Sequence, residues 1–282
     1  MRVSWFPGHM KKALRVVKES LPLVNLVLVV LDARIPSSSR NPEIEGILAG
    51  REVLFLLNKS DLASPQATSR WLSYFKGEGL AVSSRSGEGF KMLRKMIEER
   101  RGEVVESRKK RGRRDEEIRL MVMGIPNVGK SSVINRLSGR NVVRVGKNPG
   151  VTRGLQWIAL PGNGELLDIP GIFYPRVDNE EHAWHLAAVG TVREELLPVD
   201  ELALKILSFL SAVQAPCLKG MTGPPAELLE QIGRKMGLIG KEASVDAHRT
   251  ALSVIKSFRE GTYGPFTLEE PPHESPGGPH DA

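Results

Sequence analysis

The residues with the clearest chemical potential form a loop from Gly124 to Ser131, GIPNVGKS, which matches the phosphate-binding pattern G-x-x-x-x-G-K-[ST]. Its two glycines let backbone N–H groups turn toward phosphate oxygens, and the helix expected behind the loop adds partial positive charge. The Lys130 ammonium can reach the β- and γ-phosphates. A glycine-rich turn that carries Lys-Ser by chance is the alternative, and the strand–loop–helix context argues against it. From this motif we expect the following residues to bind nucleotide phosphates: Asn127, Val128, Gly129, Lys130, Ser131 and Ser132.

A second motif, Asn58-Lys59-Ser60-Asp61, fits the guanine-recognition pattern N-K-x-D. Guanine presents an N1–H and an exocyclic amino group side by side, and the Asp61 carboxylate can accept a hydrogen bond from each. Adenine lacks both donors, so the carboxylate would stay unsatisfied beside it, which argues against an ATPase. Asn58 can hold neighbouring loops and the base N7, while the aliphatic stem of Lys59 can cover the ring. The tetrapeptide alone is moderately specific, but beside a phosphate-binding loop it is strong.

Three weaker signals complete the set expected of a GTPase. Ser83 and Ser84 resemble the loop whose backbone N–H contacts the guanine O6. Thr152 is the candidate switch threonine, and the D-x-x-G motif at Asp168 to Gly171 can sense the γ-phosphate through the Gly171 N–H. We expect Mg²⁺ to be held by Ser131, Thr152 and Asp168, because hydroxyl and carboxylate oxygens are its preferred ligands.

Apolar runs that end at these motifs predict the elements that position them. Strands are expected at residues 23–31, 53–57, 80–82, 118–123, 155–160 and 165–167, with helices between them. Since nearly continuous apolar strands alternate with helices, the fold class is α/β, a Rossmann-like and mostly parallel sheet of the P-loop GTPase type. In such sheets ligands gather beyond the carboxyl ends of the strands, where the motifs lie.

The chain is expected to divide into a GTPase domain and a small helical domain. We place the GTPase domain at residues 1–177, with a guanine-recognition half at 1–99, a basic linker at 100–119 and a phosphate-binding half at 120–177. Residues 178–264 contain helical patterns without strands and predict a small all-α domain. Residues 265–282 are rich in Pro, Gly and Glu and are expected to form a disordered tail.

Composition limits the remaining possibilities. The formal net charge of +7 makes a polyanionic partner plausible, and the dense positive charge of the linker is either a solvated surface or a contact for nucleic-acid phosphates. A single cysteine, Cys217, excludes an intramolecular disulfide and fits a reducing cytoplasm. The longest apolar run is too short to span a bilayer, so we expect no membrane partner.

The order of the motifs along the chain is unusual, since the guanine-recognition motifs precede the phosphate-binding ones. With this circularly permuted order, the opening Trp5 to Met10 (WFPGHM) and the stretch Asp32 to Pro36, the chain closely resembles the circularly permuted ribosome-assembly GTPases of the YlqF/RbgA group. The resemblance covers residues 1 to about 264. It implies a GTP- and GDP-binding protein that hydrolyses GTP, contacts rRNA and acts late in assembly of the large (50S) ribosomal subunit, which stimulates hydrolysis.

One departure from many GTPases concerns the attacking water. Ile172 follows the D-x-x-G motif where many GTPases place a glutamine, and isoleucine cannot orient water. The resemblance points to His9 as the catalytic group, together with Lys130, and without the subunit we expect slow hydrolysis. It also implies that Asn127 helps to bind K⁺.

Two further questions stay open at this point. The runner-up function is a nucleotide-gated RNA-binding module in which hydrolysis is incidental, and Ile172 favours that alternative. We expect the protein to be a monomer.

Overall fold

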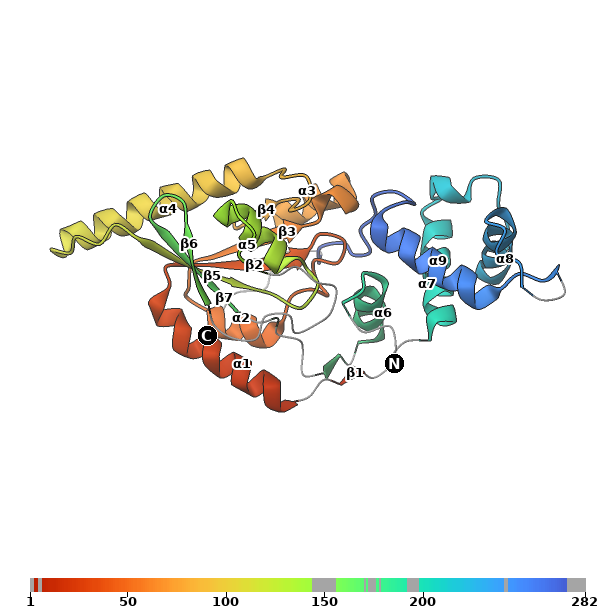
Figure 1. Ribbon diagram of the computed structural model, residues 1–282, viewed down its shortest axis with the longest axis horizontal. Helices are drawn as coiled ribbons and strands as arrows, with labels where there is room; N and C mark the ends of the chain where they lie inside the picture. The colour runs from red at the N-terminus through yellow and green to blue at the C-terminus, as the bar shows by residue number, and fades with distance from the viewer. Residues whose placement is uncertain are drawn as a thin grey trace.

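The computed structural model describes residues 3–4, 7–143, 156–169, 171, 176–177, 179–191, 198–240 and 243–272. A sheet flanked by helices forms one end of the molecule, and the helices α7, α8 and α9 form the other end (Figure 1). Helix α6 lies between the two parts in this view. Two of the expected site residues fall outside the description or only partly within it: Thr152 is not described, and of His9 only the backbone is.

Six strands form the main sheet in the order β4-β3-β2-β5-β7-β6. All neighbouring pairs are parallel except β6 and β7. The strands are β2 (Leu26–Asp32), β3 (Val53–Asn58), β4 (Gly79–Ala81), β5 (Ile118–Met123), β6 (Gln156–Leu160) and β7 (Gly164–Asp168). The mostly parallel α/β sheet predicted from the sequence is therefore confirmed.

The central strand β2 shows why these apolar runs become strands. All seven of its residues are buried, with alternate side chains in two different hydrophobic clusters. Leu28 belongs to the cluster on one face and Val29 to the cluster on the other. A parallel sheet covered on both faces needs such continuous apolar strands. The strand begins at Leu26, three residues later than predicted, because the short 3₁₀ helix η1 (Leu21–Leu23) contains Pro22.

Helices cover both faces of the sheet. Helices α1 (Pro7–Ser20), α2 (Pro42–Leu48) and α3 (Pro65–Tyr74) contribute buried residues to one cluster, whereas α4 (Phe90–Lys110) and α5 (Lys130–Ser138) contribute to the other. Figure 1 shows α1 and α2 below the sheet and α4 above it. Because the parallel strands share one direction, their carboxyl ends all open at one edge, where loops from both halves of the chain meet.

The predicted linker at 100–119 is only partly a linker. Helix α4 continues through its first half and ends at Lys110. Ion pairs one turn apart support the charged extension, including Arg101 with Glu98 at 2.5 Å and Lys110 with Glu106 at 2.9 Å. Exposed pairs of this spacing each add a small stabilisation to a helix, and that stabilisation is weakened by salt. The high charge of the predicted linker is thus compatible with a helix up to Lys110. Only the residues between Lys110 and Ile118 connect α4 to β5.

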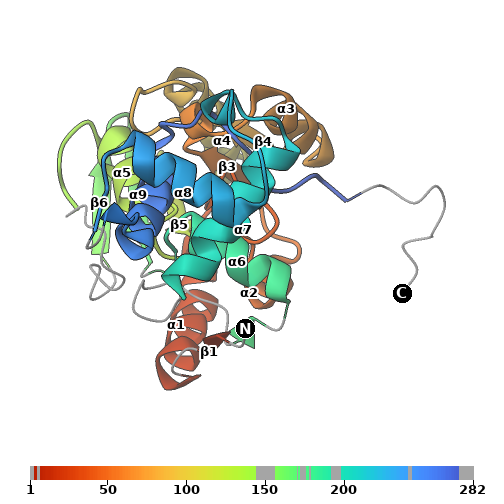
Figure 2. The same ribbon diagram turned by 90° about the vertical axis from the view of Figure 1, so that its right-hand side faces the viewer.

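The helical domain has its own hydrophobic core, but its first helix is shared. Helices α6 (Glu180–Ala188), α7 (Val199–Ala212), α8 (Pro225–Lys235) and α9 (Ala247–Glu260) all contribute to a third cluster. From α6, Ala187 and Ala188 belong to that cluster, whereas Ala183 and Leu186 pack into the cluster of the sheet domain to which α4 and α5 contribute. The predicted boundary at 178 is therefore not a packing boundary. Figure 2 shows the helical domain from the right-hand side of Figure 1.

The prediction of a disordered tail at 265–282 is wrong for residues 265–272. This segment, which we call the C-terminal strap, returns to the sheet domain: the Phe266 N–H donates to the Leu62 carbonyl (3.1 Å) and the Trp71 indole N–H donates to the Glu269 carbonyl (3.0 Å). Phe266 also stacks on Phe258 of α9 with the ring planes at 3°. Two aromatic contacts and backbone hydrogen bonds outweigh the low hydrophobicity of the segment. Residues 273–282 lie outside the described residues.

Two short strands bring the start of the chain to the second half. Strand β1 (Val3–Ser4) pairs antiparallel with β8 (Arg176–Val177), so Val3 lies opposite Val177. The pairing places the residues just before α1 near those that follow the D-x-x-G motif. Over the described ranges, no helix has both the length and the apolar character required to cross a bilayer.

Candidate functional site

The loop that follows β5 has the backbone of a phosphate cradle. Asn127 and Gly129 both have positive φ, at 62° and 98°, and α5 begins at Lys130 directly behind them. A Cβ on Gly129 would collide with the Asn58 side-chain nitrogen, so glycine is required there for shape as well as for conformation. Left-handed residues just before a helix N-terminus turn successive N–H groups inward, which creates a concave site for anions.

Lys130 lies inside this loop. Its ammonium donates a hydrogen bond to the Ile125 carbonyl at 3.0 Å, and the residue is buried. Burial lowers the pKa of Lys130 to about 8, and the negative charge of Asp168 acts in the opposite direction. A buried cation whose pKa is depressed in this way is favoured by a phosphate nearby, because the ligand supplies the negative charge that water no longer does.

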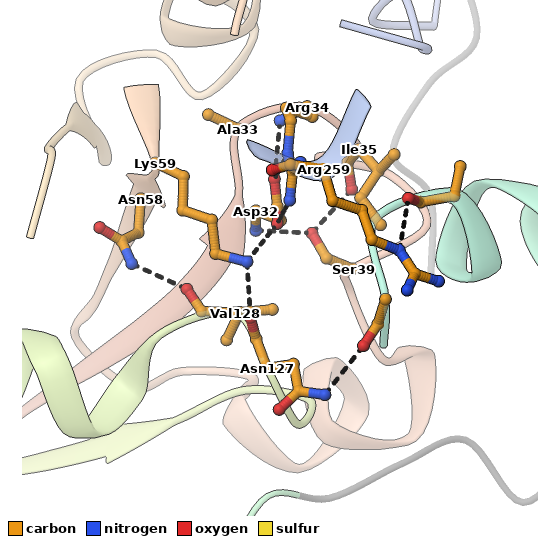
Figure 3. Close-up of polar contacts among 12 residues, drawn as sticks. Asp32, Ala33, Arg34, Ile35, Ser39, Asn58, Lys59, Asn127, Val128 and Arg259 are labelled. Atoms are coloured by element: carbon orange, nitrogen blue, oxygen red, sulfur yellow. Dashed lines mark hydrogen bonds and ion pairs between the residues drawn. The ribbon is translucent and has the colours of Figure 1, made fainter. Parts of the chain in front are cut away.

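Asn58 joins the two halves of the chain. It is fully buried at the end of β3, and its side-chain N–H donates to the Val128 carbonyl at 2.8 Å (Figure 3). Its side-chain oxygen accepts from the Ser84 N–H at 3.0 Å. One amide therefore fixes the spacing of the N-K-x-D stretch, the phosphate loop and the loop at 83–87. The hydrogen bond to Val128 spans 70 residues of sequence.

Lys59 makes a second bridge from the same strand end. Its ammonium donates to the Asn127 carbonyl at 2.6 Å and pairs with the Asp32 carboxylate at 2.8 Å (Figure 3). Fixing the ammonium in this way stretches the aliphatic stem between the two loops. Asp61 is exposed in the short 3₁₀ helix η2 (Ser60–Leu62), so its carboxylate is accessible to a ligand.

The loop at 83–87 is built from its own polar contacts. Buried Ser83 accepts at its hydroxyl from the Ser86 N–H (3.1 Å). Arg136 of α5 donates to the Ser84 carbonyl at 2.9 Å and lies over the Phe90 ring. The sequence analysis missed Arg136, since a single arginine on a helix carries no local signal of the loop that it reaches.

Of the three expected metal ligands and the γ-phosphate sensor, the structure describes all but Thr152. Asp168 ends β7 and is buried, and Ser131 lies in the first turn of α5. A Cβ added to Gly171 would approach the Lys130 ammonium to 3.0 Å and Pro126 to 2.9 Å, so the glycine backbone lies against the phosphate loop. The carboxylate of Asp168, whose charge acts on Lys130, and the hydroxyl of Ser131 are oxygen donors of the kind that fits Mg²⁺. Thr152 lies outside the described residues.

Asp32 and Arg34 form a buried ion pair at the same edge, whose role the sequence left unassigned. Two N–H groups of the Arg34 guanidinium bind both carboxylate oxygens of Asp32, at 2.9 and 2.8 Å. Burial would raise the pKa of Asp32, but Arg34 and Lys59 together hold it well below its usual range. The signal available in the sequence was a D-x-R pair at the end of an otherwise apolar strand. Burying charged side chains at such a position is costly unless they pair with each other.

The helical domain reaches the phosphate loop. The side-chain N–H of Asn127 donates to the Gly190 carbonyl, just beyond α6, at 2.8 Å. Farther along the edge, His185 of α6 contacts the Glu269 carboxylate of the strap at 2.8 Å. Of the expected site residues, the structure thus brings together those of the guanine motif and the phosphate loop, with Asp168 and Gly171 beside them. The His9 backbone lies in the first turn of α1, and its side chain is not described.

Comparison with known proteins agrees with this geometry. A family model described as a 50S ribosome-binding GTPase matches residues 119–215. Ribosome biogenesis GTPase A of Priestia megaterium is 38% identical over 281 residues, which cover 96% of this chain and 98% of the relative. The protein of the same name from Thermotoga maritima is 32% identical, and the alignment covers 97% of each chain.

Solved structures give the same result. The crystal structure of GNP-bound YlqF from T. maritima aligns with a TM-score of 0.67 at 28% identity and covers 92% of this chain and 98% of the other. The GDP-bound structure of YlqF aligns with a TM-score of 0.68 at 28% identity, covering 91% and 99%. The likeness therefore includes the helical domain as well as the sheet.

Proposed function

The chain belongs to the ribosome biogenesis GTPase A family, and from that premise we propose that it acts late in assembly of the large ribosomal subunit, which stimulates its GTP hydrolysis. It is a GTPase that serves ribosome assembly, with a nucleotide-binding domain of the P-loop class. The observation that carries the site assignment is the Asn58 side chain, which hydrogen bonds both to Val128 and to Ser84. These bonds support a single pocket built from both halves of a circularly permuted domain.

In this proposal each strand end contributes one part of nucleotide recognition. Asp61 accepts hydrogen bonds from the guanine N1–H and amino group, and the Lys59 stem covers the base. Ser83 and Ser84 line the O6 side. Backbone N–H groups of the phosphate loop and of the first turn of α5, from Asn127 to Ser132, bind the phosphates.

The phosphate end of the pocket positions the reacting group. Lys130 neutralises the β- and γ-oxygens, and the Gly171 N–H meets the γ-phosphate. Ser131, Thr152 and Asp168 would hold Mg²⁺, which supplies neutralisation of the charge that develops on the phosphates. Catalysis here is mostly a matter of position and electrostatics, which a site assembled from fixed strand ends is suited to provide.

The experiment that tests this function combines binding and turnover. We expect the protein to co-sediment with large-subunit precursors in a non-hydrolysable GTP analogue and to be released in GDP, and we expect the subunit to raise the turnover rate. Equal turnover with and without subunits, together with nucleotide-dependent binding, would instead support the nucleotide-gated RNA-binding module. Failure to bind large-subunit precursors in either nucleotide state would contradict the proposed partner.

Substituting His9→Ala should lower subunit-stimulated turnover by about 100-fold without weakening GTP binding. The reason is that general base assistance acts only on the chemical step. The pairing of β1 with β8 supports the assignment, because it brings the segment before His9 to the chain that follows Gly171. The measurement is the rate of phosphate release at saturating GTP, with GTP affinity determined by a fluorescent analogue. Full stimulated turnover in the variant would remove His9 from the mechanism.

Turnover should be about tenfold higher in K⁺ than in Na⁺ buffer of equal ionic strength, if Asn127 contributes to a monovalent cation site that takes the place of an arginine finger. The Asn127 side-chain amide is already held by its hydrogen bond to the Gly190 carbonyl, which fixes its orientation beside the phosphate loop. Nucleotide affinity measured in both buffers separates an effect on binding from one on chemistry. Identical rates in the two salts would exclude a K⁺ role.

Nucleotide binding should take up a proton at pH values above about 8. The free site holds Lys130 with a pKa of about 8 because it is buried, and bound phosphates raise that value. Well below pH 8 the amine is charged in both states and no proton moves; near and above pH 8 binding must first protonate the neutral fraction of the amine, so affinity falls as pH rises. Calorimetric titration with GDP in two buffers of different ionisation enthalpy measures the uptake.

The matched control is Lys130→Arg, whose guanidinium stays charged throughout this range. It corrects for proton changes on the nucleotide itself. Proton uptake that is equal in the variant and the original protein, or absent in both, would show that Lys130 is already charged in the free site.

A further inference from the structure

The loop from Asp32 to Ser39 leaves the carboxyl end of β2. Its first charged residues, Asp32 and Arg34, have side chains that are only 1% and 3% exposed. Two parallel hydrogen bonds of 2.9 and 2.8 Å join the guanidinium to the carboxylate. Such a fork fixes the orientation of both side chains, because rotating either one breaks both bonds. A buried pair of this kind is costly to form, which raises the question of what it does at this position.

On one side the pair contacts the guanine motif. The Asp32 Oδ2 atom accepts a hydrogen bond from the Lys59 ammonium at 2.8 Å, and the same ammonium binds the Asn127 carbonyl of the phosphate loop at 2.6 Å. The buried carboxylate thus faces two cations, Arg34 and Lys59, and holds the lysine stem extended beside the pocket (Figure 3). Without this carboxylate, Lys59 would keep only one neutral acceptor among the contacts described.

On the other side the pair contacts the helical domain. The Nη1 group of Arg34 donates to the Arg259 carbonyl in the last turn of α9 at 3.2 Å. The Arg259 side chain in turn donates to the carbonyls of Ala187 (2.8 Å) and Ala188 (3.2 Å) at the end of α6. A contiguous polar chain therefore runs from the guanine motif through Asp32 and Arg34 to two helices of the helical domain (Figure 3).

The C-terminal strap binds the same loop. The Leu268 N–H donates to the Arg34 carbonyl at 2.8 Å, and the Glu269 carboxylate accepts from the N–H groups of Ser37 (2.6 Å) and Ser38 (3.1 Å). Glu269 also contacts His185 of α6 and the Ser38 hydroxyl. Because only four residues separate the strap from α9, a displacement of α9 acts on the loop at Arg34 directly and, through the strap, at Ser37 and Ser38.

We propose that Asp32 and Arg34 are positioning residues that couple guanine recognition to the docking of the helical domain. Asp32 holds the Lys59 ammonium so that its stem covers the base, and Arg34 links this arrangement to the carboxyl end of α9. The inference rests on the proposed guanine site. By reciprocity, a nucleotide that orders Lys59 tightens α9 and the strap, and a partner that displaces α9 loosens the nucleotide. This route is separate from the switch region, since it reaches the helical domain through the base and not through the γ-phosphate.

The test is hydrogen exchange of residues 256–270 in the full chain, with and without saturating GDP. In the original protein we expect GDP to slow exchange in this segment by about fivefold or more. In Arg34→Lys one ammonium can pair with Asp32 but cannot also reach the Arg259 carbonyl, so the response to GDP should be lost although the bound state is saturated. If Arg34 had only a structural role, Arg34→Lys would raise hydrogen exchange equally with and without GDP, and GDP would still slow exchange in residues 256–270.

Two further variants test the coupling and leave the buried guanidinium of Arg34 in place. Asp32→Asn should weaken GDP binding by about tenfold, because the neutral amide no longer holds Lys59. Glu269→Gln should loosen the strap and speed GDP dissociation by about fivefold, although it lies outside the pocket. The matched control is Glu270→Gln, the neighbouring strap residue, which pairs with exposed Arg70 and should change neither quantity.

The outcomes separate this inference from the proposed function. Failure of the original protein to bind GDP would remove the guanine site itself. Binding without any change in exchange at 256–270, a response to GDP that persists in Arg34→Lys, or GDP dissociation that is the same in Glu269→Gln and Glu270→Gln would each overturn the coupling. If Arg34→Lys does not fold, as judged by its thermal transition, the comparison of Glu269→Gln with Glu270→Gln decides.

Discussion

Substituting Asp61→Asn should lower the affinity for GTP and GDP by about 100-fold or more and should raise the affinity for xanthine nucleotides. Asp61 is exposed in η2, close to Lys59 and to the loops that Asn58 holds together. In the original protein its carboxylate accepts from both guanine donors. An asparagine retains one acceptor but turns an N–H₂ group toward the guanine amino group, so two donors face each other and neither is satisfied.

Xanthine reverses that mismatch, because it has a carbonyl oxygen where guanine has its amino group. The asparagine N–H₂ then finds an acceptor, while the asparagine oxygen still accepts from the xanthine N1–H. Competition of GDP and xanthosine diphosphate against a fluorescent nucleotide measures both changes. Retained binding of the xanthine nucleotide is also the control for correct folding. If the variant binds GDP as well as the original protein does, Asp61 does not contact the base.

Substituting Lys130→Met should lower GTP turnover by about 100- to 1,000-fold and leave the nucleotide-free protein at least as stable. The loss of turnover follows from the loss of the only described side-chain cation that lies inside the phosphate loop. The effect on stability follows from the pKa: a lysine whose pKa falls from 10.5 to about 8 in the folded state is a charge that folding disfavours at neutral pH. Methionine has a similar shape and no charge to bury.

Thermal unfolding with and without GDP measures both parts of this prediction. The original protein should gain stability on adding GDP, whereas the variant should start higher or equal and gain much less. Lys95→Met is the matched control, since Lys95 is an exposed helical lysine paired with Glu99. A variant that is destabilised without nucleotide, or that hydrolyses GTP normally, would contradict the role given to Lys130.

Functional sites commonly contain residues that lower the stability of the free protein, and in this pocket those residues are buried charges. Lys130, Asp32 and Arg34 are all buried charged residues at one edge of the sheet. Asp32 and Arg34 compensate each other by direct pairing. Lys130 hydrogen bonds a neutral carbonyl and is only partly compensated by Asp168, so it depends on a ligand for full neutralisation.

The sequence by itself determined the sheet and the residues at its edge. Strand β2 is buried at every residue, and β5 is buried at every residue except Arg119, so each appears as a short, nearly continuous apolar run of the length typical of a buried parallel strand. The motif residues follow these runs directly, and a parallel sheet carries all such ends to one edge. The hydrogen bond from Asn58 to the phosphate loop is therefore a consequence that local pattern and fold class together could predict.

Only the tertiary structure decided how the helical domain and the strap attach. The contacts of Arg34 with Arg259, of Asn127 with Gly190 and of Glu269 with Ser37 join residues that are 225, 63 and 232 positions apart. Each is a single polar contact that a side chain makes with a backbone group, and every residue offers the same backbone groups. Such contacts therefore leave no periodicity or composition in the sequence, and the strap's polar composition predicted the opposite of what its docked backbone and two aromatic contacts produce.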